Sequence, residues 1–317
     1  MLPMQTALNS TIAHRFISLF VLTCYTAGFL TFAHAQPLQV VSSFSIMTDL
    51  VEQVGGEHVQ TYTLIKPETD AHTFEPSAQD ARYLANAKLV FINGLAFEPW
   101  LDRLTKASGF TGLIVTASNG ITPLNANPHE KHDVYGHHNH QHGEYDPHAW
   151  QNVINVIIYV ENIARALIQA DPKRANEYNL RANDFIAQLK ALDADILKTI
   201  QQIPPERRIL VTTHNSFAYF ANRYGLTTLS VSGKGNESLS STASMAQLIE
   251  QVRAQRIPAI FLEMTSSPKI LEQVIRETDT KLGGKLYADA LSVKDAPADT
   301  YIKMMRTNVN TLVNALR

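Results

Sequence analysis

Four side chains that bind metal ions in many proteins are spread through the sequence. Each stands where a predicted strand or loop passes into the next element: His72, His148, His214 and Asp289. Three imidazoles and one carboxylate would fill the four positions of a tetrahedral Zn2+, and such a closed shell suits holding an ion better than reacting at it. The chemistry predicted from these residues is therefore metal capture.

Each of these residues, taken alone, has an ordinary structural explanation. A histidine near a strand end more often makes a packing hydrogen bond, and a loop aspartate more often caps a turn. The set gains weight because its members lie at equivalent positions in a chain with only 12 histidines. Open α/β sheets bind ligands at the carboxyl ends of their strands, which is where these four residues are predicted to lie.

Short β-branched runs alternate with amphipathic helical patterns, which predicts an α/β fold with mainly parallel sheets. In the first half of the chain we expect strands at 38–43, 59–64, 89–92 and 113–115, and helices at 46–54, 78–87, 99–107 and about 153–170. In the second half we expect strands at 208–212, 226–231, 259–262 and 284–287, and helices at 217–224, 243–255, 268–278 and 300–316. This pattern predicts two (β/α) lobes, with two candidate ligands from each lobe meeting in the cleft between them.

A long helical segment without strand signals separates the two halves. Pro172 suits the first turn of a helix with Asp171 as its N-cap, and apolar residues then recur at helical spacing up to Pro204. Roughly 30 helical residues would extend about 45 Å, enough to join two lobes and resist wide hinge opening. The alternative is an ordinary surface helix with two short partners. The expected organisation is a leader at 1–35, an N-terminal lobe at 36–170, a linking helix at 171–203 and a C-terminal lobe at 204–317.

The first 35 residues have the pattern of an export signal. Arg15 precedes an apolar run over 16–32, and Ala-His-Ala at 33–35 matches an A-x-A cleavage site, so cleavage is predicted after Ala35 and the chain is expected in the periplasm. The alternative is an uncleaved membrane anchor, although the run is shorter than the roughly 20 residues that span a bilayer. Lipidation at Cys24 is disfavoured because Thr23, rather than a small residue such as Gly or Ala, precedes it.

Composition restricts the remaining classes of function. The leader contains one charged residue, Arg15, so residues 36–317 carry 27 − 1 = 26 Lys and Arg against 29 Asp and Glu. With this balance and no basic tract, nucleic acid is not an expected partner. The single cysteine lies in the leader, so a hydrophobic core rather than disulfides must stabilise the rest, which is long enough for two lobes.

A second group of histidines lies within residues 128–146, among Asp and Glu. The group consists of His129, His132, His137, His138, His140 and His142. The tract lacks apolar periodicity, which predicts a solvated loop. Neutral imidazoles one or two residues apart can share an ion, so we expect a low-affinity metal collector or sensor. The alternative is a linker with incidental histidines. Deleting 127–144 is expected to lower the metal stoichiometry without removing the tight site.

Three further carboxylates stand beside the candidate ligands. Glu263 ends a predicted strand and faces the cleft, where it could orient a ligand imidazole, serve as a substitute ligand or only form an ion pair. The orienting role meets the general need to fix the tautomer of a coordinating histidine. Asp70 and Asp146 are comparable candidates for this role.

Five ordered blocks resemble the metal-binding class of solute-binding proteins, cluster A-I, which serve bacterial ABC transporters for zinc and manganese. The blocks are VVSSFSI at 40–46, NGL at 93–95, DPHAW at 146–150, HNSFAYF at 214–220 and DAL at 289–291. The resemblance implies two (β/α) lobes, one backbone helix between them and a high-affinity ion in the cleft. In this class the first ligand stands in a D-P-H-x-[FY]-x-P loop. Ala71 replaces that first proline here, and His72 is retained.

The resemblance also implies a metal and a partner. Members that look built for manganese tend to carry a carboxylate at the third ligand position, whereas His214 gives three nitrogens and one carboxylate, a set suited to Zn2+. Zinc-specific members also carry a His-rich loop. The implied function is Zn2+ capture for import through an ABC permease in the inner membrane, by a monomer. Whether a periplasmic metallochaperone loads the site stays open. A manganese-binding member, with bound Mn2+, and a periplasmic zinc buffer or adhesin are the alternatives.

A zinc hydrolase is the rival class of function. It would need an open coordination position for water and a carboxylate general base, a role in which Glu263 could be cast. The sequence has no helical H-E-x-x-H pair, and a fourth protein ligand would close the coordination shell. We therefore predict no catalytic residue and do not expect an enzyme.

Overall fold

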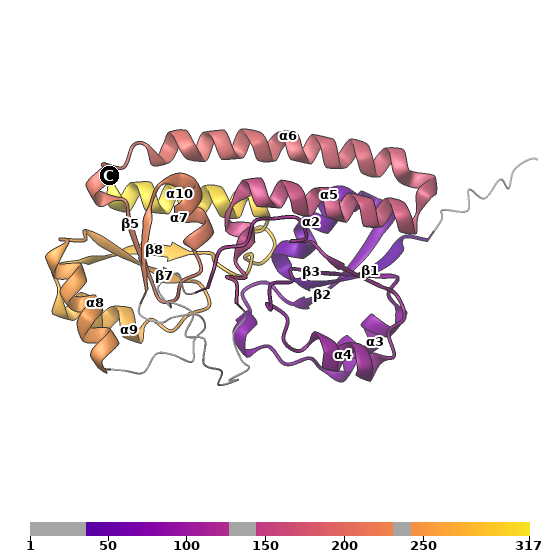
Figure 1. Cartoon of the computed structure of the whole chain (residues 1–317), viewed down its shortest axis with the longest axis horizontal. Coiled ribbons are helices and arrows are strands. Elements are labelled where there is room, and N and C mark those ends of the chain that lie inside the picture. Colours follow the sequence, from indigo (N-terminus) through magenta and orange to yellow (C-terminus); the bar gives the residue numbers. More distant parts are fainter. Residues whose placement is uncertain (1–35, 127–143, 231–241) are drawn as a thin grey trace, which may run out of the picture. The chain divides into compact units, whose positions relative to one another are not determined.

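The computed structural model describes residues 36–126, 144–230 and 242–317. Pro37–Arg317 form one compact unit in which strands and helices alternate, as the sequence predicts for an α/β fold (Figure 1). The predicted leader with its cleavage site after Ala35, and the six histidines of the tract at 128–146, lie outside the described residues.

The N-terminal lobe is built on one parallel sheet with the strand order β2-β1-β3-β4. Its strands are β1 (Leu38–Phe44), β2 (Val59–Ile65), β3 (Leu89–Ile92) and β4 (Leu113–Thr116), and its connecting helices are α2 (Ser45–Gly55), α3 (Ala78–Asn86) and α4 (Leu101–Ser108). The chain leaves β1 toward β2 on one side and returns to β3 on the other. This reversal opens a crevice at the carboxyl ends of the strands, where such sheets bind ligands.

The C-terminal lobe contains two parallel strand pairs in its described residues. β5 (Ile209–Thr212) pairs with β6 (Thr227–Ser230), and β7 (Ala259–Glu263) pairs with β8 (Lys281–Leu286). The helices are α7 (Ala218–Tyr224), α8 (Thr242–Ala254), α9 (Lys269–Glu277) and α10 (Tyr301–Leu316). β8 begins three residues before the predicted 284 because two glycines hid its start. A Cβ at Gly283 would lie 2.6 Å from the Phe261 ring, so close strand packing requires glycine there.

One long helix, α6 (Ala175–Ile200), packs against α2 and α5 (Val153–Ala170) of the N-terminal lobe and against α10 and α7 of the C-terminal lobe (Figure 1). Its 26 residues extend about 39 Å at 1.5 Å per residue. This helix is shorter than the linking helix predicted at 171–203, because Pro172–Arg174 form a separate 3-10 turn before it and it ends at Ile200. Asp171 does not cap this turn with its side chain, and its carboxylate instead pairs with Arg174 at 3.1 Å.

Side chains at both ends fasten α6 to the lobes. Near its start, Glu177 pairs with His58, which follows α2 in the N-terminal lobe. Further along, the buried carboxylate of Asp193 accepts hydrogen bonds from Arg223 Nε and the Tyr224 hydroxyl, both at 3.0 Å, and both from α7. The helix is thus attached to both lobes as well as joining them.

A continuous hydrophobic core crosses from one lobe to the other. The main cluster of buried apolar side chains extends from Val40 in β1 to Leu316 in α10, and a smaller cluster lies beneath α8 and α9. Wide rotation of the lobes would expose part of this shared core at roughly 25 cal/mol per Å2 of apolar surface. The packing therefore disfavours large hinge motion.

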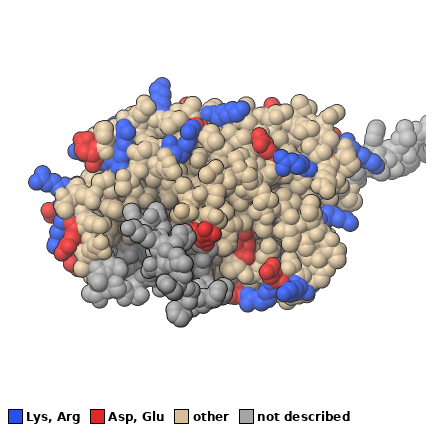
Figure 2. All heavy atoms as spheres, in the orientation of Figure 1, with Lys and Arg blue, Asp and Glu red and all other residues tan. Residues whose placement is uncertain are grey.

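Within the described residues, one helix, α5, is long and apolar enough to cross a membrane by length and composition, with a mean hydropathy of 1.4. Its inner face carries Tyr159, Val160, Ile163 and Leu167, all buried, and the helix packs against α2 and α6. α5 is therefore a core helix of this unit. On the face shown in Figure 2, Lys and Arg are interspersed with Asp and Glu and form no patch of one sign.

Candidate metal centre

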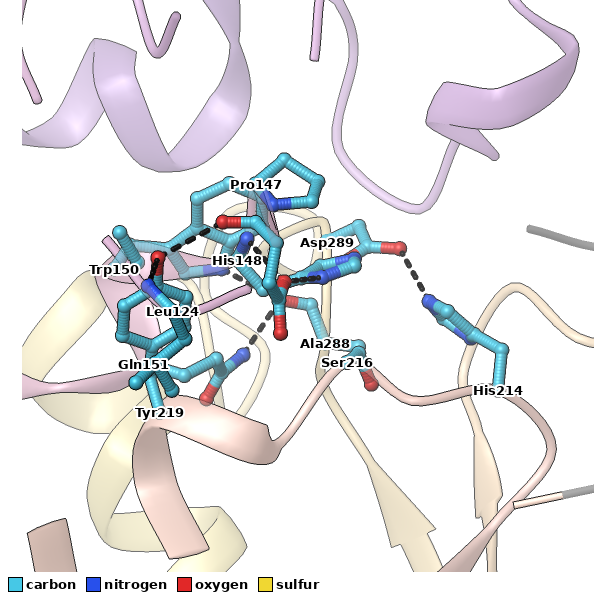
Figure 3. Close-up of polar contacts among 12 residues, drawn as sticks. Leu124, Pro147, His148, Trp150, Gln151, His214, Ser216, Tyr219, Ala288 and Asp289 are labelled. Atoms are coloured by element: carbon cyan, nitrogen blue, oxygen red, sulfur yellow. Dashed lines mark hydrogen bonds and ion pairs between the residues drawn. The ribbon is translucent and has the colours of Figure 1, made fainter. Parts of the chain in front are cut away.

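The fold brings the four candidate ligands together from distant parts of the chain. One donor atom from each lies within 4.8 Å of the donor atoms of the other three: His72, His148, His214 and Asp289. His72 and His148 come from the N-terminal lobe, and His214 and Asp289 come from the C-terminal lobe. Figure 3 shows three of them, His148, His214 and Asp289, with the residues that surround them.

The Asp289 carboxylate is the common neighbour of the three imidazoles. Its Oδ1 lies 3.4 Å from His148 Nε2, and its Oδ2 lies 3.5 Å from both His72 Nε2 and His214 Nε2. Zinc bonds of about 2.0–2.2 Å at tetrahedral angles place two ligand atoms about 3.3–3.6 Å apart. Each of these three separations falls in that range, although one is measured from Oδ1 and two from Oδ2, and the whole donor set spans up to 4.8 Å.

His72 stands in a short 3-10 turn, Ala71–Thr73, on the connection that follows β2. Asp70 accepts a hydrogen bond from the backbone N–H of His72 at 2.9 Å, which fixes the start of the turn. The His72 side chain is 25% exposed, whereas those of the other three ligands are at most 3% exposed. His72 is thus the candidate ligand that is most accessible to solvent.

His148 is oriented by the carboxylate two residues before it. Asp146 Oδ1 lies 2.7 Å from the ring Nδ1 of His148 and accepts a hydrogen bond from its backbone N–H at 2.9 Å. This contact favours a proton on Nδ1 and leaves Nε2 free to coordinate, a common arrangement at metal sites.

His214 is oriented in the same way by a residue distant in sequence. Glu263, at the end of β7, faces the ring Nδ1 of His214 and accepts hydrogen bonds from its backbone N–H at 3.0 Å and from the Thr213 hydroxyl at 2.9 Å. Glu263 is completely buried. Its carboxylate thus holds the histidine with Nε2 turned toward Asp289.

The buried donor atoms at the centre lack hydrogen-bond partners among the described residues. These atoms are His148 Nε2, His214 Nε2 and both carboxylate oxygens of Asp289. Buried polar atoms in folded proteins are almost always satisfied, so each exception needs an explanation. A bound cation would satisfy both imidazole nitrogens and one carboxylate oxygen of Asp289, and the donor set fits this explanation.

The electrostatic environment of the centre favours a positive charge. Burial alone would raise the pKa of Asp289, but the imidazoles of His148, His214 and His72 lower it well below the ordinary value. Burial would lower the pKa of His214, yet Glu263 and Asp289 raise it well above the usual value. The pKa of His72 is raised in the same sense, since Asp289 outweighs burial. The site therefore stabilises a cation, whether a proton or a metal ion.

The three carboxylates singled out from the sequence have different contacts. Glu263 and Asp146 lie against the ring nitrogens of His214 and His148, whereas Asp70 binds the backbone of His72. Sequence reasoning missed Trp150 and Gln151, which hold the backbone beside Asp289. Trp150 belongs to the DPHAW block, but no signal in a single sequence indicates a hydrogen bond to a residue 138 positions away.

Comparison with known proteins identifies the family. The model of the family described as zinc-uptake complex component A, periplasmic, matches residues 40–315. The chain belongs to this family. Zinc-uptake component A proteins and their relatives are the substrate-binding components of metal ABC transporters rather than enzymes, as the sequence predicted.

Individual relatives and structural neighbours of this chain are named for different metals. The iron-binding protein YfeA of Yersinia pestis is 32% identical over 279 residues, covering 88% of this chain and 86% of YfeA. A Mn-bound periplasmic metal-binding protein from Candidatus Liberibacter asiaticus is 31% identical, with a TM-score of 0.77, and covers 89% of this chain and 100% of its own. The periplasmic zinc-binding protein TroA from Treponema pallidum is 27% identical, with a TM-score of 0.78, and covers 89% of this chain and 99% of its own. These likenesses support the predicted two-lobed α/β fold.

Proposed function

We propose that the chain captures Zn2+ with high affinity in the periplasm and delivers it to an ABC-type permease in the inner membrane. The observation that carries the proposal is the donor set, three imidazoles and one carboxylate, with separations of 3.4–3.5 Å between Asp289 and each imidazole. Nitrogen-rich sets of four ligands suit Zn2+, whereas Mn2+ is favoured by more oxygen donors.

The four proposed ligands are His72, His148, His214 and Asp289. Glu263 and Asp146 support the proposal because they would fix the tautomers of His214 and His148. Asp70 would act more indirectly, through the backbone of His72. The auxiliary role of the histidines at 129–142 rests on the sequence alone.

Manganese is the second candidate, since a structural neighbour of 31% identity is Mn-bound. A competition titration of the purified protein with Zn2+ and Mn2+ tests the choice. We expect Zn2+ to bind far more tightly. A tighter complex with Mn2+ would reverse the assignment, and failure of both ions to bind would end it. Because Zn2+ exceeds Mn2+ in affinity at most nitrogen-containing sites, metal analysis of protein purified without chelator is the companion measurement.

Localisation and partners form the second part of the proposal. We propose, on sequence grounds alone, an export signal over 1–35 with cleavage after Ala35 and lobes at 36–170 and 204–317, and a monomeric state as the family resemblance implies. Transport is distinguished from zinc buffering or adhesion by growth: deletion of the gene should impair growth only when zinc is scarce. Equal growth of the mutant in zinc-depleted medium would favour the buffer or adhesin.

A further inference from the structure

The short 3-10 turn Ala149–Gln151 connects two ligands that come from different lobes. His148 occupies the position immediately before the turn. Within the turn, Trp150 Nε1 and Gln151 Nε2 both donate hydrogen bonds to the backbone carbonyl of Ala288, at 2.9 Å and 2.7 Å (Figure 3). Ala288 directly precedes Asp289. The turn therefore follows one proposed ligand, His148, and is hydrogen-bonded to the backbone next to another, Asp289.

The turn itself is held rigidly. The hydroxyl of Tyr301, at the start of α10, donates to the Trp150 carbonyl at 2.7 Å. The Trp150 ring is fully buried, with ring centroids at 4.9 Å from Phe44, 5.0 Å from Phe97 and 5.3 Å from His148. A side chain locked by packing in this way can place its N–H donor reproducibly.

Among the described residues, the Ala288 carbonyl is the hydrogen-bond acceptor found for each of these two donors. Gln151 is fully buried, its Oε1 has no hydrogen-bond partner in the part of the chain that the structure describes, and its Nε2 serves only the Ala288 carbonyl among the contacts found there. A buried carbonyl that accepts two side-chain donors from the other lobe is more strongly held than normal loop backbone. The double contact is therefore suited to positioning.

We propose that Trp150 and Gln151 are positioning residues that fix Asp289 opposite His148 and so set the metal affinity of the site. The inference rests on the proposed function and concerns residues that do not touch the ion. His148 Nε2 and Asp289 Oδ1 lie 3.4 Å apart across the lobe junction. The two hydrogen bonds to the Ala288 carbonyl would hold this distance. His72 and His214 complete the site from the connections that follow β2 and β5.

Substituting the two tryptophans of the chain gives a matched test. Trp150→Phe keeps an aromatic ring and removes the N–H that reaches Ala288. Trp100→Phe makes the same chemical change at a buried ring whose Nε1 has no partner among the described residues. Competition with a chromophoric zinc chelator should show about a tenfold loss of affinity for Trp150→Phe, in the range for partners that orient ligands, and no loss for Trp100→Phe. Equal affinities of wild type and Trp150→Phe would overturn the proposal.

Gln151→Met provides an independent variant if Trp150→Phe does not fold, because it removes the second donor at nearly constant volume. A double-mutant cycle with Asp289→Asn then separates positioning from general destabilisation. If the hydrogen bonds to Ala288 act through Asp289, Gln151→Met should cost little further zinc affinity in the Asp289→Asn background. Full additivity of the two losses would refute the positioning role. A wild-type protein that binds no metal would refute the proposed function instead, so the two failures are distinguishable.

Discussion

The two most buried imidazoles of the site, His148 and His214, have the same surroundings. Each has a carboxylate against Nδ1 and an Nε2 without a hydrogen-bond partner among the described residues. Asp146 serves His148 from the same loop, whereas Glu263 serves His214 from a neighbouring strand. A carboxylate in this position fixes the ring orientation and makes the imidazole a stronger donor. The affinity of the site should therefore depend on these carboxylates as well as on the ligands.

Replacing Glu263 by Gln should weaken zinc binding about 10–100-fold. The amide keeps the size of the side chain but removes the charge that raises the basicity of His214. Isothermal titration with a competing chelator measures the effect, and a thermal unfolding curve shows whether the variant folds. An unchanged dissociation constant in a folded Glu263→Gln protein would contradict the role given to this residue.

Zinc affinity should fall as the pH is lowered, and the loss should begin above the ordinary histidine pKa of about 6.5. Without metal, Glu263 and Asp289 raise the pKa of His214, and Asp289 raises that of His72, so both rings retain protons to higher pH. Zinc must displace these protons, because only neutral imidazole coordinates. Titration calorimetry in buffers of different ionisation enthalpy counts the protons released. A proton count near zero at pH 7 would show the predicted coupling to be absent.

At the scale of elements, the sequence predicted the alternation of strands and helices because apolar periodicity is local. The missed features have local causes too. Gly283 and Gly284 obscured the start of β8, and Pro172 begins a 3-10 turn rather than the long helix itself. The sheet order β2-β1-β3-β4 was not predicted, since strand pairing depends on contacts between segments far apart in sequence.

The turn that carries His72 should accept the proline found in related loops. Ala71 occupies the first position of this turn, where proline is favoured, and Asp70 has the extended backbone that a following proline requires, φ −70° and ψ 116°. Ala71→Pro should raise the free energy of unfolding by about 0.4–1 kcal/mol by restricting the unfolded chain. Urea unfolding measures the change, and Ala71→Ser serves as the control without a ring. Destabilisation by proline would mean that the buried Ala71 site cannot hold the ring.

At the scale of the whole molecule, the lobes behave as one packed body. The core runs across the junction, and α6 is fastened to both sides through Glu177 and Asp193. Metal entry in such a molecule is more easily accommodated by small movements near the exposed His72 than by wide lobe rotation. The shared core thus disfavours lobe rotation, and the partial exposure of His72 leaves the site an approach from solvent.

Removing residues 127–144 and joining the ends with a short glycine linker should leave the tight site intact while lowering the total number of bound zinc ions. The base of this segment is closed by described contacts: Ala126 N–H donates to the Glu144 carbonyl at 3.0 Å, and the Tyr219 hydroxyl binds Leu124 N–H and the Asp146 carbonyl, both at 2.9 Å. Equilibrium dialysis with metal analysis gives stoichiometry and affinity together.

Two comparisons make this deletion decisive. Tyr219→Phe in the intact chain removes the hydrogen bonds from α7 to Leu124 and to the Asp146 carbonyl. Because the Asp146 side chain orients His148, this substitution should weaken the tight site. Loss of tight binding in the deletion variant, with Tyr219 in place, would show that the segment contributes to the site itself. Unchanged stoichiometry would remove the auxiliary role assigned to its histidines.

By itself the sequence predicted most of the elements, the types of the candidate ligands and their positions at the ends of strands or loops, because periodicity, turn chemistry and donor chemistry are local properties of neighbouring residues. Only the tertiary structure decided that His72, His148, His214 and Asp289 meet, that Glu263 rather than Asp70 lies against a ligand ring, and that Trp150 and Gln151 hold the backbone of Ala288. These contacts join residues up to 217 positions apart (289 − 72). Their geometry is set by the packing of two lobes around a shared core, and no local pattern specifies it.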